Sequence, residues 1–129
     1  MAAEDIFQFT DRNFQKTVLR SKIPVLAQFW IPDGGPCRSM APIFDELAGE
    51  YRDNVMFGKI NAYDCPGLCA EFRITSVPTL LLLEEGITVH KCVGLRTKEQ
   101  IIELLDKYFA MKKKKKEEEE NNERREESR

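Results

Sequence analysis

The sequence is short of the features that mark membrane, secreted and nucleic-acid-binding proteins. It has no apolar run long enough to span a bilayer. Its 20 basic and 22 acidic side chains nearly cancel, so we expect no nucleic acid and no membrane among its partners. Four scattered cysteines in 129 residues are too few for a secreted disulfide scaffold.

The start of the chain and its length bear on location and size. Residues 1–5 are acidic and lack the basic-then-apolar pattern of a signal peptide. Together with the small number of cysteines, this pattern predicts a soluble cytoplasmic protein whose thiols are mostly reduced. The length fits one domain with a real hydrophobic core.

The most informative stretch present is a strand, a tight turn and a helix. Residues 24–30 form a near-continuous apolar run, typical of a strand that is buried on both faces. A turn of glycine and proline follows, and then apolar residues recur at helical spacing from Cys37 to about Tyr51. Pro36 suits the first helical position. Cys37 is therefore expected in the first turn of a helix, facing unpaired backbone N–H groups.

The chain up to residue 110 alternates strand and helix patterns. Further strands are predicted at residues 6–9, 54–60, 79–83 and 87–93, and further helices after Thr10, Pro66 and Thr97. Thr97 and Gln100 have the spacing of a capping box at the start of the last helix. We expect that helix to bury Ile101, Ile102, Leu104, Leu105 and Phe109.

These features, taken together, resemble the thioredoxin family. The turn Asp33-Gly34-Gly35-Pro36-Cys37 lies where the family has Trp-Cys-Gly-Pro-Cys. Other matches at family-like spacing are Trp30, Pro42, Lys59, Val77-Pro78-Thr79 and Gly94. The resemblance covers about residues 5–110 and implies the thioredoxin fold of the α/β class. That fold is a mixed five-stranded sheet of strand order 1-3-2-4-5, flanked by four helices.

The resemblance also implies a groove for polypeptide. The family's proline before the fourth strand is cis, and the peptide edge before it pairs with an extended substrate chain. The groove residues implied here are Trp30, Asp33, Gly34, Gly35, Pro36, Ser76, Val77, Pro78, Val93 and Gly94. The expected partners are a polypeptide or thiol-containing protein, and further a thioredoxin reductase or glutathione. We expect a monomer that needs no cofactor and no metal.

Two departures from the family affect its chemistry. The family's attacking cysteine is Gly34 here, so the turn holds no dithiol, and Cys37 matches only the resolving cysteine. The family's buried aspartate, which takes a proton from that second cysteine, is Gln28, and a glutamine cannot titrate. Lys59, which the family keeps beside that acid, is expected to lie next to Gln28, so the family's ion pair between these two positions is gone.

Four hypotheses on function follow, and the first is favoured. The protein binds polypeptide in the groove without dithiol turnover, or it is an oxidoreductase that acts through Cys37 with an external resolving thiol. Gly34 could instead be an accidental or engineered replacement in an ordinary thioredoxin, against which Gln28 argues. Finally, the thiols could sense oxidation.

The other cysteines leave three readings open. A short helix from Pro66 would place Cys65 and Cys69 one turn apart, within reach of a regulatory disulfide. A zinc site would need His90 and Cys92 as well, and the spacing matches no common site. We favour ordinary, partly buried cysteines.

Residues 111–129 differ in composition from the rest. Lys112–Lys116 is all basic, Glu117–Glu120 is all acidic, and the remainder is polar and mixed. Such a segment has little to bury, so we expect a mostly disordered tail after a domain of residues 1–110. The alternatives are a last helix that continues into the lysines, or an arm that makes electrostatic contacts, including contacts between two tails.

Overall fold

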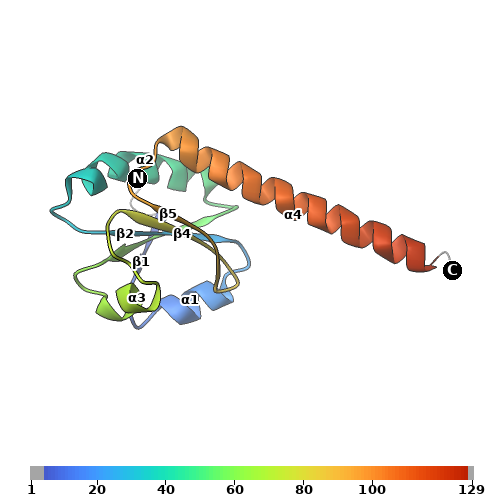
Figure 1. Cartoon of the computed structure of the whole chain (residues 1–129), viewed down its shortest axis with the longest axis horizontal. Coiled ribbons are helices and arrows are strands. Elements are labelled where there is room, and N and C mark those ends of the chain that lie inside the picture. The colour runs from blue at the N-terminus through green and yellow to red at the C-terminus, as the bar shows by residue number, and fades with distance from the viewer. Residues whose placement is uncertain (1–4, 128–129) are drawn as a thin grey trace. The chain divides into compact units, whose positions relative to one another are not determined.

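A computed structural model describes residues 5–127. In chain order the elements are β1 (Ile6–Phe9), α1 (Phe14–Arg20), β2 (Val25–Trp30), α2 (Gly35–Tyr51), β3 (Met56–Asn61), α3 (Pro66–Glu71), β4 (Thr79–Glu84), β5 (Ile87–Val93) and α4 (Lys98–Glu127) (Figure 1). The chain divides into two compact units, of which the first ends at Arg96 and the second begins at Thr97. The first unit therefore holds the whole sheet and three helices, and the second holds α4.

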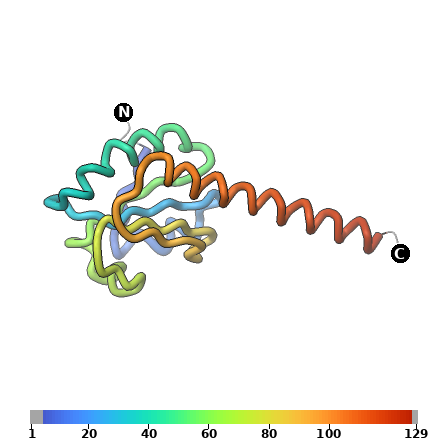
Figure 2. Tube along the Cα trace, turned by 45° about the horizontal axis from the view of Figure 1, so that its top comes forward, coloured from blue at the N-terminus to red at the C-terminus, as the bar shows by residue number. Residues whose placement is uncertain are grey.

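The five strands form one mixed sheet in the order β1-β3-β2-β4-β5. β1 and β2 run parallel to β3, whereas β4 runs antiparallel to both β2 and β5. Within the first unit, α2 covers one face of the sheet, and α1 and α3 cover the other (Figures 1 and 2). This confirms the predicted fold class and strand order.

The core explains why the two central apolar strands lie in the middle of the sheet. Residues 25–29 of β2 and 80–83 of β4 are at most 1% exposed. Aromatic rings join the helices to one face, with Phe9 of β1 and Phe14 of α1 at 5.1 Å between ring centroids. A Cβ at Gly58 would overlap the ring of Phe9, so β1 and β3 can pack this closely only because position 58 is glycine.

Short-range hydrogen bonds fix the ends of two helices. The N–H of Asn13 donates to the Thr10 hydroxyl (3.1 Å), and the N–H of Thr10 donates to Asn13 Oδ1 (2.8 Å). The helix predicted after Thr10 accordingly begins at Phe14. At the start of α4, Thr97 and Gln100 make the same reciprocal pair, which confirms the predicted capping box.

α4 is one continuous helix from Lys98 to Glu127, although residues 111–129 are predicted to be mostly disordered. Residues 111–127 are therefore helical, and 128–129 lie outside the described residues. The physical reason is local: lysine, glutamate and arginine have high helix propensity, and each lysine from 113 to 116 lies four residues before a glutamate. Such pairs support a helix without any hydrophobic contact.

Burial along α4 is narrower than predicted. Ile101 and Leu105 are fully buried, whereas Ile102, Leu104 and Phe109 are partly exposed. Every described side chain from position 110 onward is exposed. No helix within residues 5–127 combines the length and the apolar character that a membrane crossing requires.

Candidate functional site

The turn between β2 and α2 has the predicted geometry. β2 ends at Trp30 and α2 begins at Gly35, so Cys37 lies in the first turn of a 17-residue helix. The N–H of Gly34 donates to the Ile31 carbonyl (3.3 Å), and the N–H of Arg38 donates to the Gly34 carbonyl (3.1 Å). The Cys37 side chain is buried, with 5% of its surface exposed. The turn thus holds a single, nearly covered thiol.

The space around Gly34 shows how much of a dithiol site remains. A Cβ built on Gly34 would lie 3.5 Å from Cys37 Cβ and 3.2 Å from Cys37 Sγ. Disulfide-bonded cysteines have their Cβ atoms about 3.5–4.5 Å apart. The backbone therefore keeps the spacing of a cysteine pair, and only the first sulfur is missing. The same Cβ would lie 2.9 Å from Ile31 Cγ1, so a side chain at position 34 requires a small shift.

A pocket of about 80 Å³ opens beside the Cys37 thiol. Its lining consists of Gln28, Trp30, Ile31, Pro32, Cys37, Arg38, Ala41 and Lys59. Gln28 is 1% exposed, and its Nε2 donates to the sulfur of Met40 (3.9 Å), which is a weak acceptor. Trp30 Nε1 is a buried donor with no acceptor among residues 5–127. The pocket therefore offers a non-titrating amide where an acid would be needed to take the thiol proton.

Lys59 lies next to Gln28, as predicted, because the two residues face each other in the β2–β3 register. Its Nζ lies 4.0 Å from Asp45 Oδ1 of α2 and 5.5 Å from the centre of the Trp30 ring. Gln28 offers Lys59 no negative charge, and the acidic side chain near the lysine is Asp45, which the sequence did not indicate. Asp45 neutralises the lysine from the neighbouring helix.

Asp33 makes a contact that the sequence did not reveal. The Tyr63 hydroxyl donates to Asp33 Oδ1 (2.8 Å), and both side chains are exposed. This hydrogen bond raises the pKa of Tyr63, because the carboxylate accepts a proton that ionised tyrosine would no longer supply. The parallel register of Trp30 with Asn61 brings the two following loops to the same sheet edge, and only that register could have indicated the contact.

Residues 76–79 and 93–94, which are predicted to form the second half of the groove, are joined by hydrogen bonds around a cis proline. The Val77–Pro78 peptide bond is cis, and the Thr79 hydroxyl donates to the Ser76 carbonyl (2.7 Å). The N–H of Gly94, which has a φ of 96°, donates to the Pro78 carbonyl (2.8 Å). Thr79 pairs with Phe29 of β2 on one side and with Val93 of β5 on the other. This register places Pro78 and Gly94 at the same sheet edge as Trp30.

Cys65 and Cys69 are free thiols in the structure, and their sulfurs have separate partners. The Cys65 thiol donates to the Phe9 carbonyl and the Cys69 thiol to the Ala62 carbonyl, both at 3.8 Å. Burial raises the pKa of both thiols, and the negative charge of Asp11 raises it further. A raised pKa leaves less thiolate at neutral pH, so both are poor nucleophiles.

The remaining soft side chains do not assemble into a metal centre. Cys92 is buried in β5, and His90 of the same strand is exposed. No group of three or more His, Cys, Asp or Glu side chains in the described part of the chain could hold an ion. The zinc reading of Cys65, Cys69, His90 and Cys92 therefore lacks a ligand set there.

Comparison with known proteins agrees with the fold. The Thioredoxin family model matches residues 5–107. "Thioredoxin 1" of Synechococcus elongatus is 41% identical over 99 residues, covering 77% of this chain and 92% of that protein. "Thioredoxin" of Pyropia yezoensis is 38% identical over 105 residues, covering 81% and 98%.

A third relative is named for a plastid form. "Thioredoxin M-type, chloroplastic" of Chlamydomonas reinhardtii is 39% identical over 98 residues, covering 76% of this chain and 70% of that protein. The cytoplasmic location expected for this chain stays a prediction. The matched family model, the relatives, the sheet order and the strand–turn–helix around Cys37 agree, and this chain belongs to the thioredoxin family.

Proposed function

We propose that this protein binds extended polypeptide in the groove beside Cys37 and does not turn over as a dithiol reductase. The observation that carries the proposal is the Gly34 geometry. Position 34 has the distance to Cys37 that a disulfide partner needs, and it supplies no sulfur. Without a second sulfur in the turn, a mixed disulfide between Cys37 and a substrate cannot be resolved from within the turn.

The acid–base part of the reaction is also missing. Gln28 is buried beside the pocket that Cys37 lines, and its amide neither takes nor gives a proton. Lys59 is paired with Asp45, and its ammonium group is a cation that cannot accept the thiol proton. Two separate functions of a reductase site, the attacking sulfur and the proton acceptor, are therefore absent together.

The backbone before Pro78 and the apolar side chains near it support the proposed binding of polypeptide. Ser76 is exposed and Val77 is partly exposed before the cis proline, so this peptide edge can pair with an extended chain. Val93 and Leu95 beside it are 51% and 50% exposed, although both are large and apolar. Apolar side chains of a bound segment would cover them and gain free energy from the buried area.

The test uses a polypeptide that has no free thiol. We expect fluorescently labelled, S-carboxymethylated insulin B chain to bind with a Kd on the order of 10 µM, measured by anisotropy. Val93→Asp should weaken binding by about tenfold, because a carboxylate would be buried without a partner. Cys37→Ser should leave the Kd unchanged.

Val89→Asp is the matched control. Val89 is on the same strand and is 44% exposed, but it lies four residues before Val93, about 13 Å along the strand. We expect this variant to bind as the parent does. Equal losses in the two valine variants, or no binding by the parent, would contradict the proposed groove.

The second candidate is a single-thiol exchange, favoured by the pocket that opens beside the Cys37 sulfur. In that reaction the Cys37 thiolate attacks a disulfide, forms a mixed disulfide and releases the other half as a thiolate. An external thiol such as glutathione then displaces Cys37. Incubation with glutathione disulfide, followed by intact mass measurement, tests this candidate: one added glutathione in the parent and none in Cys37→Ser would support it.

A further inference from the structure

The exposed part of α4 carries its charges in an order that is complementary to itself. Residues 112–116 are lysine and residues 117–120 are glutamate, within one helix whose side chains are all exposed from 110 to 127. Each block is longer than one helical turn of 3.6 residues, so both signs are present on every face of the helix. The sign therefore changes along the helix axis and not around it.

This order distinguishes the two ways in which two copies could lie side by side. A parallel pair in register sets lysine against lysine and glutamate against glutamate. An antiparallel pair centred between Lys116 and Glu117 sets Lys116 opposite Glu117 and Lys113 opposite Glu120. Because the pair has two-fold symmetry, each of these contacts occurs twice, once from each copy. Backbone dipoles also favour the antiparallel arrangement.

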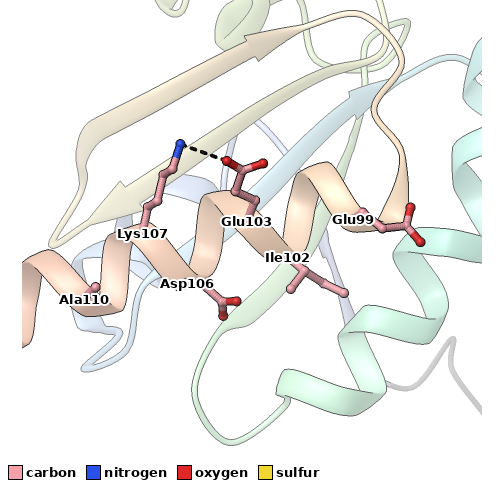
Figure 3. Close-up of a pocket in the computed structure, with 6 residues that line it drawn as sticks. All are labelled: Glu99, Ile102, Glu103, Asp106, Lys107 and Ala110. Atoms are coloured by element: carbon pink, nitrogen blue, oxygen red, sulfur yellow. Dashed lines mark ion pairs between the residues drawn. The ribbon is translucent and has the colours of Figure 1, made fainter.

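The same register matches charges beyond the two blocks. It sets Lys107 opposite Glu126, and it brings Arg125 to the level of Tyr108, about 3 Å along the axis from the level of Asp106. Figure 3 shows Glu99, Glu103 and Asp106 on the first half of α4, with Lys107 in an ion pair with Glu103 (3.0 Å). Beyond the two blocks the register therefore adds one opposed pair, Lys107 with Glu126, and one like-charge pair, Asp106 with Glu127.

We propose that residues 110–123 of α4 pair antiparallel with the same segment of a second copy of this chain. The pairing replaces the expected monomer with a weak dimer, and it does not depend on the proposed function of the groove. The segment spans about 21 Å, and exposed ion pairs contribute roughly 0.2–1 kcal/mol each. With Met111 as its one large apolar side chain, the interface relies on charge and weakens as salt screens it.

The experiment measures the mass of the full chain by sedimentation equilibrium across protein concentration. At about 20 mM salt we expect a monomer–dimer equilibrium, and at about 0.5 M salt we expect association to weaken by roughly tenfold or more. A chain that stays monomeric at millimolar concentration in low salt would overturn the proposal. Association that is unchanged in high salt would overturn it as well.

Block reversals supply the matched variants. The basic variant carries Glu117→Lys, Glu118→Lys, Glu119→Lys and Glu120→Lys, and the acidic variant carries Lys113→Glu, Lys114→Glu, Lys115→Glu and Lys116→Glu. Each should be monomeric alone, because like charges now meet at every level from position 113 to position 120. An equimolar mixture of the two should form a heterodimer.

A swapped variant with all eight changes separates pairing from helix stability. Its blocks are reversed in order and remain complementary in an antiparallel pair, so it should associate as the parent does. Circular dichroism on each variant reports helix content, because single-block variants also lose their internal Lys–Glu spacing. Self-association of the single-block variants as strong as that of the parent would contradict the proposal, as would a mixture that remains monomeric.

Discussion

The turn before α2 and the edge between β4 and β5 lie at the same end of the sheet, and they differ in what they keep of the family pattern. The turn has Gly34 in place of the attacking cysteine and Gln28 in place of the buried acid. The edge keeps the cis Val77–Pro78 bond and Gly94, joined by a 2.8 Å hydrogen bond. One region lacks two of the side chains that the family pattern has, and the other keeps the cis proline and the glycine of that pattern.

Under the proposed function, binding and turnover depend on different residues of one site. Peptide recognition at a sheet edge uses backbone groups and nearby apolar surface, which survive any change at position 34. Disulfide reduction needs two sulfurs and a proton acceptor at set distances.

Gly34→Cys should remove the largest part of the difference between the two regions. A sulfur at position 34 has the Cβ spacing to Cys37 that a disulfide requires. We expect the rate of insulin reduction with dithiothreitol to rise by roughly 100-fold over the parent, because the missing nucleophile is restored. Gly34→Ala fills the same space near Ile31 Cγ1 without a thiol, and its rate should equal the parent rate.

Gln28→Asp should separate the acid from the nucleophile. In the Gly34→Cys background it should raise the reduction rate by about a further tenfold, through a restored proton acceptor. It should also lower the free energy of unfolding at pH 7 by about 2 kcal/mol, because position 28 is 1% exposed.

The pH dependence of that cost has a definite sign. Burial raises the pKa of a carboxyl above its unfolded value, so the folded state binds more protons and stability falls as pH rises. Urea unfolding of the Gln28→Asp variant should therefore show a smaller loss near pH 4 than near pH 7. Gln28→Asn has no titrating group, and a similar pH dependence in it would rule out this explanation.

Cys65 and Cys69 should respond to alkali in the same direction. Their pKa values are raised by burial and by Asp11, so the contribution of the neutral thiols to stability is complete below the unfolded pKa. It should be lost progressively as pH rises above about 8.5. Thermal unfolding from pH 7 to 10 should show this fall, and the double variant Cys65→Ala/Cys69→Ala should show a shallower one.

The smallest expected effect concerns the contact between the turn and the loop after β3. Asp33→Asn removes the carboxylate that accepts from the Tyr63 hydroxyl, so the pKa of Tyr63 should move down toward its ordinary value. Absorbance titration of the phenol measures the change, with Tyr63→Phe identifying the signal of this tyrosine. An unchanged Tyr63 titration would mean that the hydrogen bond does not form in solution.

Much of the fold and the positions of the motif residues could be predicted from the sequence because they rest on local patterns and fixed spacing. The apolar run of β2, the turn at Gly34 and Pro36, and the capping box at Thr97 each act over a few residues. The strand order came from the resemblance, which implies a whole topology at once.

The contacts that the sequence did not reveal join distant parts of the chain. Tyr63 is 30 residues from Asp33. Asp45 is in α2, the helix that connects β2 to β3, and lies beside Lys59 of β3. The helical conformation of residues 111–127 was not expected, for another reason. Their low hydrophobicity indicated disorder, whereas helix propensity and charge spacing decide the conformation of an isolated helix.

Turnover by the unaltered chain tests the central claim most directly. The measurement is the rate of insulin disulfide reduction by the parent and by Cys37→Ser, with dithiothreitol as the electron donor, beside a dithiol thioredoxin as reference. We predict that both rates equal the rate with dithiothreitol alone. A parent rate that matches the dithiol reference and disappears in Cys37→Ser would contradict the account.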